Sequence, residues 1–199
     1  MKWLRSIARL NNMKTEHALA VVLKDMMSHQ PLDTISVLEL SKKCHISRKT
    51  FYYHYHDIYD LLTQVFLEEK IPGAQSADSF RSLIEIVFNY YKANEAFINA
   101  TLASAGKDLL SEFVYNIFYT SALRFIKKID ADNVLHPNSK KSIARFYAFG
   151  YGYSTVYYLS NYKVKTLNGL INSFNFIDAD NFKKNVQKAI NLEKNNEKL

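Results

Sequence analysis

A cluster of hydrogen-bond donors opens the segment 48–54, and its chemistry suits nucleic acid. Arg48, Lys49 and Thr50 follow one another, and no acidic residue comes after them until Asp57. Arginine and lysine can reach guanine O6 and N7 in the major groove, and hydroxyl groups can hold phosphates. A basic helix start also occurs in all-helical proteins that never bind DNA, so the residue types alone leave both interpretations open.

Metal or catalytic chemistry is the competing interpretation of the chain's reactive side chains. No histidine lies with acids or with Cys44 at a spacing that closes a ligand set within one element. The sequence also lacks a glycine-rich phosphate loop, a nucleophile elbow and a paired-carboxylate constellation. We therefore expect no metal, no cofactor and no enzymatic activity. The six histidines are His17, His29, His45, His54, His56 and His136.

The residues before this cluster predict two short helices joined by a tight turn. Ser36 and Glu39 form a capping box, in which the hydroxyl and the carboxylate each accept a backbone N–H at the start of the first helix. Ser47 is a good N-cap for the second helix. The residues between them, 45–47, are enough to turn a helix pair through a large angle. This arrangement would place the donor cluster at the start of the second helix.

The second helix is expected to have one buried and one exposed face. Phe51 and Tyr55 lie four residues apart and can face the core together. Tyr52, Tyr53 and His54 would then point outward. Docking such a second helix into the major groove is the helix-turn-helix geometry.

The stretch from Lys14 to Phe66 resembles the DNA-binding domain of the tetracycline-repressor (TetR) family of bacterial transcription regulators. Within that family it is similar to a Gram-positive branch that contains regulators and co-activators related to the dihydroxyacetone-kinase operon regulator. The segments that carry the resemblance are Ile35–Val37, Leu40–Ser47, Arg48–Tyr55 and Asp57–Leu62.

The resemblance implies roles for particular residues and for partners. It implies double-stranded operator DNA as the partner, a homodimer, and a small-molecule effector. It places the phosphate contacts at Ser36, Ser47, Tyr52 and His54, and the residues nearest the bases at Arg48, Lys49, Thr50 and Tyr53.

Three positions depart from the family pattern. His45 stands where the family usually has glycine, in a turn that is expected to need a positive φ. Ile58 replaces a lysine that binds phosphate in many members, and Leu38 is apolar at a usually polar position. A lower affinity for DNA is therefore expected, which keeps open a co-activator that acts through a metabolite or protein partner.

Composition favours an all-helical protein with a basic first quarter. The 199 residues are 48% hydrophobic and include only three prolines and five glycines. Residues 1–56 contain nine Lys/Arg and four acids, whereas residues 57–199 contain seventeen and fifteen. This concentration of positive charge is expected of a DNA-binding head. One cysteine, no bilayer-length apolar run and no convincing signal peptide predict a cytoplasmic protein without membrane segments.

The expected organisation is a head over residues 1–71 and a body over residues 72–199. The head has a core at 14–56 and a linking helix at 57–71, and Pro72-Gly73 marks the boundary. Residues 1–12 could be a DNA-contacting arm or an upstream extension. The remaining helices are predicted at 14–29, 79–93, 94–104, 108–129, 139–161, 167–174 and 179–192.

Two features of the predicted body point to binding surfaces. Its aromatic side chains could line a pocket for a partly apolar effector, although aromatic residues at helical spacing are more often core. Gly150 and Gly152 within one helix suggest a close helix approach, either inside the monomer or across a dimer formed by 139–161 and 179–192. The candidate ligand-binding residues are Tyr91, Phe97, Tyr115, Tyr119, Tyr147 and Tyr151.

We therefore expect an all-α, TetR-type DNA-binding regulator, a repressor that a small-molecule effector releases. The alternative is a co-activator of the same family with weak DNA binding.

Overall fold

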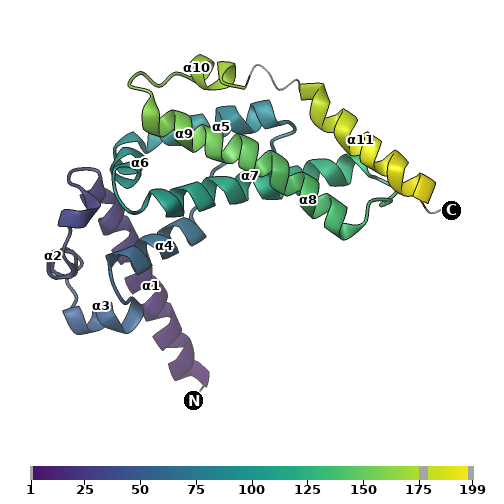
Figure 1. Cartoon of the computed structure of the whole chain (residues 1–199). Coiled ribbons are helices and arrows are strands. Elements are labelled where there is room, and N and C mark those ends of the chain that lie inside the picture. The colour runs from purple at the N-terminus through teal and green to yellow at the C-terminus, as the bar shows by residue number, and fades with distance from the viewer. Residues whose placement is uncertain (1, 175–178, 197–199) are drawn as a thin grey trace. The chain divides into compact units, whose positions relative to one another are not determined.

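The protein is all-helical, as predicted. The computed structural model describes residues 2–174 and 179–196, and no β-strand occurs within these ranges (Figure 1). No helix in the same ranges is long and apolar enough to cross a membrane. The elements are α1 (Lys2–Met27), η1 (Leu32–Thr34), α2 (Val37–Lys43), α3 (Arg48–His54), α4 (Ile58–Glu68), α5 (Phe80–Ala93), α6 (Glu95–Leu102), α7 (Lys107–Ile129), α8 (Pro137–Ala148), the π-helical turn η2 (Phe149–Tyr153), α9 (Ser154–Asn161), α10 (Leu167–Asn172) and α11 (Ala179–Asn196).

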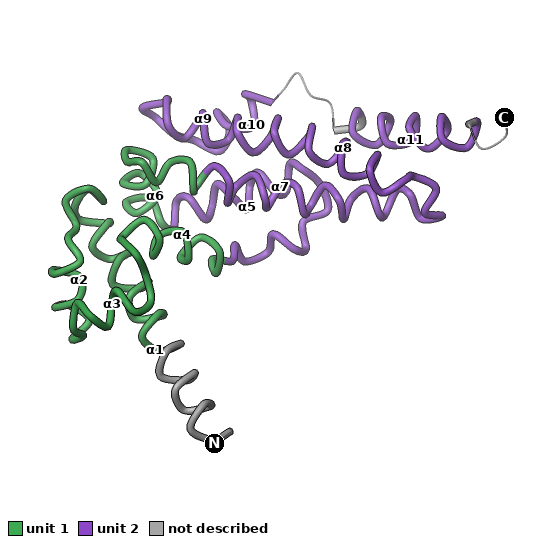
Figure 2. The backbone as a smooth tube through the Cα atoms, turned by 60° about the horizontal axis from the view of Figure 1, so that its bottom comes forward, with its two compact units in different colours: residues 1–69, 94–110 green, residues 70–93, 111–199 purple. Residues whose placement is uncertain are grey.

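The chain forms two compact units. Unit 1 comprises Met1–Glu69 and Asn94–Leu110, and unit 2 comprises Lys70–Ala93 and Ser111–Leu199 (Figure 2). Unit 1 therefore contains α6 in addition to the first four α-helices. The functional division into a head at 1–71 and a body at 72–199 stays a prediction.

Most helix boundaries lie close to the predicted ones, and two segments differ. The first helix begins at Lys2 rather than at Lys14, so the upstream residues continue the same helix. The segment predicted as one helix over 139–161 is helical but is interrupted by the π-helical turn η2. That turn contains both glycines of the segment, where the helical hydrogen-bond ladder is easiest to distort.

Unit 1 is built around a small apolar core. Leu19 and Leu23 of α1, Leu40 of α2 and Leu61 of α4 are completely buried, as is Phe51 of α3. These residues recur at helical spacing on the inner face of each helix, which is why the short helices pack together rather than unfold. The core thereby fixes the α2–α3 pair against α1 and α4.

A charged contact joins α1 to the residue that follows α4. The Lys24 ammonium lies 2.9 Å from the Glu69 carboxylate and 5.2 Å from the centre of the Phe97 ring. The Phe97 ring in turn lies 5.8 Å from that of Phe66. Through Phe97, α6 is therefore part of the packing of α1 and α4.

The core of unit 2 is an aromatic stack centred on Phe80. Its ring centre lies 4.4 Å from that of Tyr151 and 5.7 Å from that of Tyr147, both in a stacked arrangement. The ring of Phe182 meets it edge-on at 5.0 Å. Offset and edge-to-face pairs of this kind stabilise beyond the burial of area, by about 0.5–1.5 kcal/mol each.

Gly152 allows η2 to lie directly against α7. A Cβ atom at this position would lie 3.1 Å from the Cα atom of Tyr115, which is too close for most side chains. A Cβ atom at Gly150 would have no described atom within 4 Å apart from its own helix backbone and chain neighbours. The close approach predicted for the glycine pair therefore exists inside unit 2 at Gly152, whereas Gly150 faces open space.

A buried carboxylate holds the loop between α7 and α8. Asp130 accepts hydrogen bonds from the backbone N–H groups of Val134 and Leu135 at 2.8 and 3.1 Å, and the Lys140 ammonium lies 2.8 Å away. Burial opposes the ionisation of Asp130, but the bonds from Lys140 and from the two N–H groups outweigh it and lower its pKa.

Asp130→Asn is expected to lower the free energy of unfolding by about 2–4 kcal/mol at neutral pH. Because the pKa is depressed in the folded state, this stabilisation is complete above the ordinary aspartate pKa of about 4 and is lost as the pH falls through the lowered value. Urea unfolding at several pH values measures it. The matched control, the exposed Asp132→Asn, should change stability by less than about 0.5 kcal/mol. Equal losses in the two variants would contradict the assignment.

Candidate functional site

The turn between α2 and α3 is closed by backbone hydrogen bonds at the end of α2. The N–H of Ile46 donates to the carbonyl of Ser41 at 3.0 Å, and the N–H of His45 donates to that of Lys42 at 3.1 Å. His45 has φ 54°, which confirms the positive φ expected at this position. This is the Schellman arrangement, which usually uses glycine because a side chain crowds that conformation. The turn sets the direction in which α3 leaves α2.

Both helices of the pair begin with the predicted serine caps. The Ser36 hydroxyl accepts from the N–H of Glu39 at 3.2 Å, and the Ser47 hydroxyl accepts from the N–H of Thr50 at 3.0 Å. The hydroxyls of Ser47 and Thr50 also lie 2.9 Å apart. Capping uses an oxygen lone pair, so the hydroxyl hydrogen of Ser36 remains available as a donor to a phosphate.

The outer face of α3 carries basic and phenolic side chains. Tyr53 is 76% exposed and Tyr52 is 50% exposed, whereas Phe51 is completely buried, which confirms the predicted positions of these three side chains. Arg48 and Lys49 are exposed as well. The Arg48 guanidinium lies 6.0 Å from the centre of the Tyr52 ring, a contact that limits its freedom. No acidic residue lies on α3, so this face can approach a polyanion.

The prediction that His54 points outward is wrong. Its side chain is only 5% exposed, and its Nδ1 lies 3.2 Å from a carboxylate oxygen of Glu16 on α1. The contact joins residues 38 positions apart, and the local helix pattern gave no sign of it. The imidazole thus ties the end of α3 to α1. A phosphate contact through its other ring nitrogen stays a prediction.

The start of α4 differs from the surface that the family pattern implies. Ile58 is buried at 8% exposure, so it contributes to the core of unit 1. The side chain of Asp57 accepts from the N–H of Asp60 at 2.8 Å and caps the helix. The carboxylates of Asp57 and Asp60 place negative charge at the helix N-terminus, where the backbone would otherwise favour a phosphate.

The histidines and Cys44 do not form a metal site within the residues that the structure describes. No group of three or more His, Cys, Asp or Glu side chains there could hold a metal ion. Burial raises the pKa of the Cys44 thiol, which disfavours the thiolate that metals require.

The six aromatic candidates for ligand binding are not brought together. Phe97 belongs to unit 1, and the other five belong to unit 2. Tyr151 borders two cavities of unit 2, of about 670 and 520 Å³, and Tyr147 borders the smaller one. Tyr91, Tyr115 and Tyr119 are not among the described residues that border either cavity.

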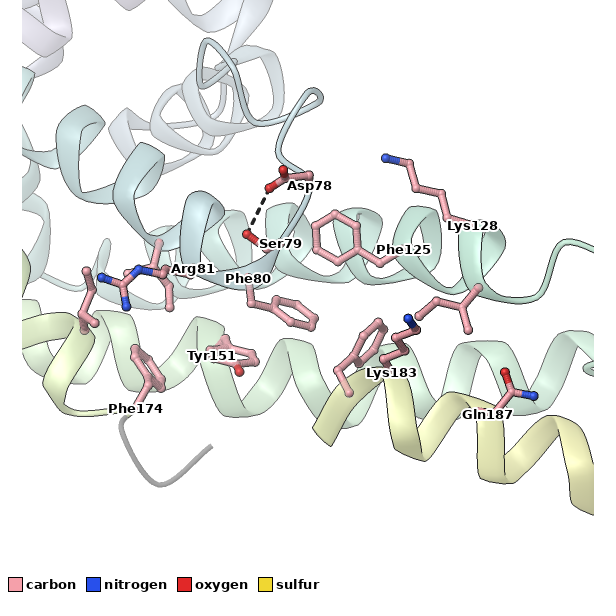
Figure 3. Close-up of a pocket in the computed structure, with 14 residues that line it drawn as sticks. Asp78, Ser79, Phe80, Arg81, Phe125, Lys128, Tyr151, Phe174, Lys183 and Gln187 are labelled. Atoms are coloured by element: carbon pink, nitrogen blue, oxygen red, sulfur yellow. Dashed lines mark hydrogen bonds between the residues drawn. The ribbon is translucent and has the colours of Figure 1, made fainter. Parts of the chain in front are cut away.

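The larger cavity has an aromatic floor, and of its residues only Tyr151 was among the predicted ligand-binding candidates. Phe80, Phe125, Tyr151 and Phe174 come from four separate parts of unit 2 and surround it (Figure 3). Burial and the neighbouring Tyr147 raise the pKa of Tyr151 to about 12, so its hydroxyl stays protonated at physiological pH. The helical spacing of Phe80, Phe125 and Phe174 gave no sign that they border a cavity.

The part of the chain after the helix-turn-helix matches a known family of regulators. The TetR family model described as "Transcriptional regulator C-terminal region" matches residues 78–176. No protein in the curated set matches the chain.

Two regulators are among the proteins whose solved structures are similar to this chain. The dihydroxyacetone kinase operon activator DhaS is 17% identical, with 92% of this chain and 95% of that chain covered and a TM-score of 0.49. Native NalD, the secondary repressor of the MexAB-OprM multidrug efflux pump in Pseudomonas aeruginosa, is 12% identical, with 89% and 97% covered and a TM-score of 0.49.

The first unit has the helix-turn-helix described above, and residues 78–176 match the regulator C-terminal region. The chain belongs to the TetR family of transcriptional regulators.

Proposed function

We propose that the protein is a homodimeric repressor that binds operator DNA through α3 and is released by a small molecule bound in unit 2. The observation that carries the DNA-binding part is the outer face of α3, where Arg48, Lys49, Tyr52 and Tyr53 are exposed on a helix fixed by buried Phe51. In this proposal Arg48, Lys49, Thr50 and Tyr53 lie nearest the bases, Ser36, Ser47 and Tyr52 hold the phosphate backbone, and His54 positions α3 through its contact with Glu16.

The dimer is supported by an exposed aromatic face in unit 2. Phe146, Phe149, Tyr153 and Tyr157 are 73, 51, 42 and 64% exposed and belong to the continuous segment α8–η2–α9. Covering each such side chain stabilises an interface by about 1.5–3 kcal/mol. Gly150 lies within this segment with open space above it, which leaves room for the backbone of a second copy. Two heads related by a two-fold axis would read half-sites about one DNA turn apart.

Release follows from a difference in ligand affinity. A small molecule that binds unit 2 better when the heads are wrongly spaced shifts the dimer away from the DNA-binding state. The same coupling requires operator DNA to weaken the binding of that molecule.

A co-activator that acts through a metabolite or protein partner is the second candidate. The start of α4 favours it, because Ile58 is buried and Asp57 and Asp60 place negative charge where a phosphate would lie. In that case unit 1 would bind DNA weakly and without strong sequence preference.

Lys49→Ala and Tyr52→Ala are expected to weaken binding to the DNA just upstream of the protein's own gene by about 1–3 kcal/mol each. Anisotropy titrations at two salt concentrations measure this. Wild-type affinity should fall steeply with salt, because phosphate contacts release counterions. Lys163→Ala removes an exposed lysine of unit 2 and serves as the control. Unchanged binding in both α3 variants would remove the assignment of the recognition helix, and weak, non-specific wild-type binding would favour the co-activator.

His54→Ala distinguishes a positioning role from a phosphate contact. Because the His54 imidazole ties α3 to Glu16, we expect a lower thermal midpoint and weaker operator binding, with an unchanged dependence of affinity on salt. A lost phosphate contact would instead reduce the slope of log affinity against log salt by about 1. Glu16→Ala, which removes the partner alone, should reproduce the loss of thermal stability if the two side chains act as a pair.

Gly150→Arg tests the dimer surface, because no described atom beyond its own helix backbone and chain neighbours lies within 4 Å of a Cβ atom at this position. If a second copy packs there, the dimer dissociation constant should rise by about tenfold to a hundredfold through crowding and a buried charge. Sedimentation velocity measures it, and Asn89→Arg on the exposed side of α5 is the control. Equal dimerisation in the two variants would place the interface elsewhere.

A further inference from the structure

The chemistry around the 670 Å³ cavity of unit 2 indicates which kind of molecule it takes. The walls are aromatic and aliphatic, with Phe80 from α5, Phe125 from α7, Tyr151 from η2 and Ile171 from α10 (Figure 3). Its volume lies in the range of pockets that enclose most of a drug-sized molecule. Flat aromatic surfaces of this kind favour a planar apolar ligand body, which can stack on them.

Charged side chains border the same cavity, and most of them are positive. Arg81, Lys128 and Lys183 are cations, whereas Asp78 is the acid among the bordering residues that the structure describes. The Arg81 guanidinium lies 3.4 Å from Glu85 and is partly neutralised there. The local excess of positive charge therefore rests on the two lysines.

The Asp78 carboxylate is already engaged. Its Oδ1 accepts hydrogen bonds from the hydroxyls of Ser79 and Ser82, each at 3.1 Å. These bonds, with the nearby Lys128 charge contributing less, lower the pKa of Asp78. Lys128 thus has an acid in its vicinity, and the ionised Asp78 carboxylate offsets part of the positive charge at that edge of the cavity.

Lys183 is the cation best placed to meet a ligand. It is exposed on α11, and its side chain points from that helix toward α7 across the cavity (Figure 3). No ion pair of Lys183 occurs among the residues that the structure describes. A neutral or cationic ligand that covered it would remove water from this ammonium without compensation, at a free-energy cost that an anionic group avoids.

We propose that this cavity binds a planar aromatic carboxylate, with its rings against Phe80, Tyr151 and Phe174 and its carboxylate at Lys183. The inference rests on the proposed effector-binding role of unit 2 and names the chemical class of that effector.

Three probes of one shape test the charge preference. Isothermal titration of the full-length protein with 2-naphthoate, 2-naphthalenemethanol and 2-naphthylmethylammonium compares an anion, a neutral molecule and a cation on the same ring system. Naphthoate is expected to bind about tenfold to a hundredfold more tightly than the alcohol, the range of one hydrogen bond to a charged group. The ammonium probe should bind least. Equal binding of the three probes, or binding of none, would overturn the proposal.

Two matched variants locate the effect. Lys183→Gln should reduce the preference for naphthoate over the alcohol to less than about threefold, the loss expected when a charged donor becomes neutral. Lys188→Gln removes the same charge from the same helix at a residue that does not border this cavity, and it should leave the preference intact. Ile171→Trp should fill the space and weaken all three probes together. Equal effects of the two lysine variants would overturn the assignment of Lys183.

The readouts separate this inference from the proposed function. Probe binding is measured without DNA, and operator binding without probe. Normal operator binding with no preference for naphthoate refutes the ligand class alone. A preference for naphthoate in a protein that shows no specific operator binding refutes the repressor alone.

Discussion

Burial of Phe51 is the interaction on which the exposed outer face of α3 depends. α3 has seven residues, and an isolated helix of that length is not stable in water. It exists because Phe51 is completely enclosed by unit 1, while the cap at Ser47 satisfies the free N–H of Thr50. One buried ring therefore fixes which side chains face outward. Arg48, Lys49, Tyr52 and Tyr53 are presented as a set because the opposite face of the same helix is used for packing.

The π-helical turn η2 connects the interior of unit 2 with its surface. Tyr151 points inward to stack on Phe80, and Gly152 lies against α7, whereas Phe149 and Tyr153 of the same turn are exposed. One short segment thus borders the cavity and carries the proposed dimer face. In our account, a ligand that alters the packing around Tyr151 also alters the proposed dimer face, because Tyr151 and part of that face belong to η2. The geometry of that face would set the spacing of the two heads.

Local patterns predicted the features that depend on neighbouring residues. The caps at Ser36 and Ser47 and the burial of Phe51 follow from spacings of about four residues, and the structure confirms them. The positive φ of His45, which the family resemblance implied, is confirmed as well. Contacts between residues far apart in the sequence could not be predicted from such local patterns. His54 turns inward because of Glu16, 38 positions away. The aromatic cavity assembles residues from five elements, and α6 packs into unit 1 through Phe97, one of the predicted ligand-binding residues.

Selection of binding sites from random duplex DNA tests the central claim most directly, because it assumes nothing about the natural operator. The account predicts that the wild-type protein enriches a palindromic sequence whose half-sites lie about one helical turn, 10 base pairs, apart. It also predicts that Lys49→Ala loses most of that enrichment. If the wild-type protein enriches no common sequence, or if Lys49→Ala enriches the same sequence equally well, α3 does not recognise DNA bases as proposed.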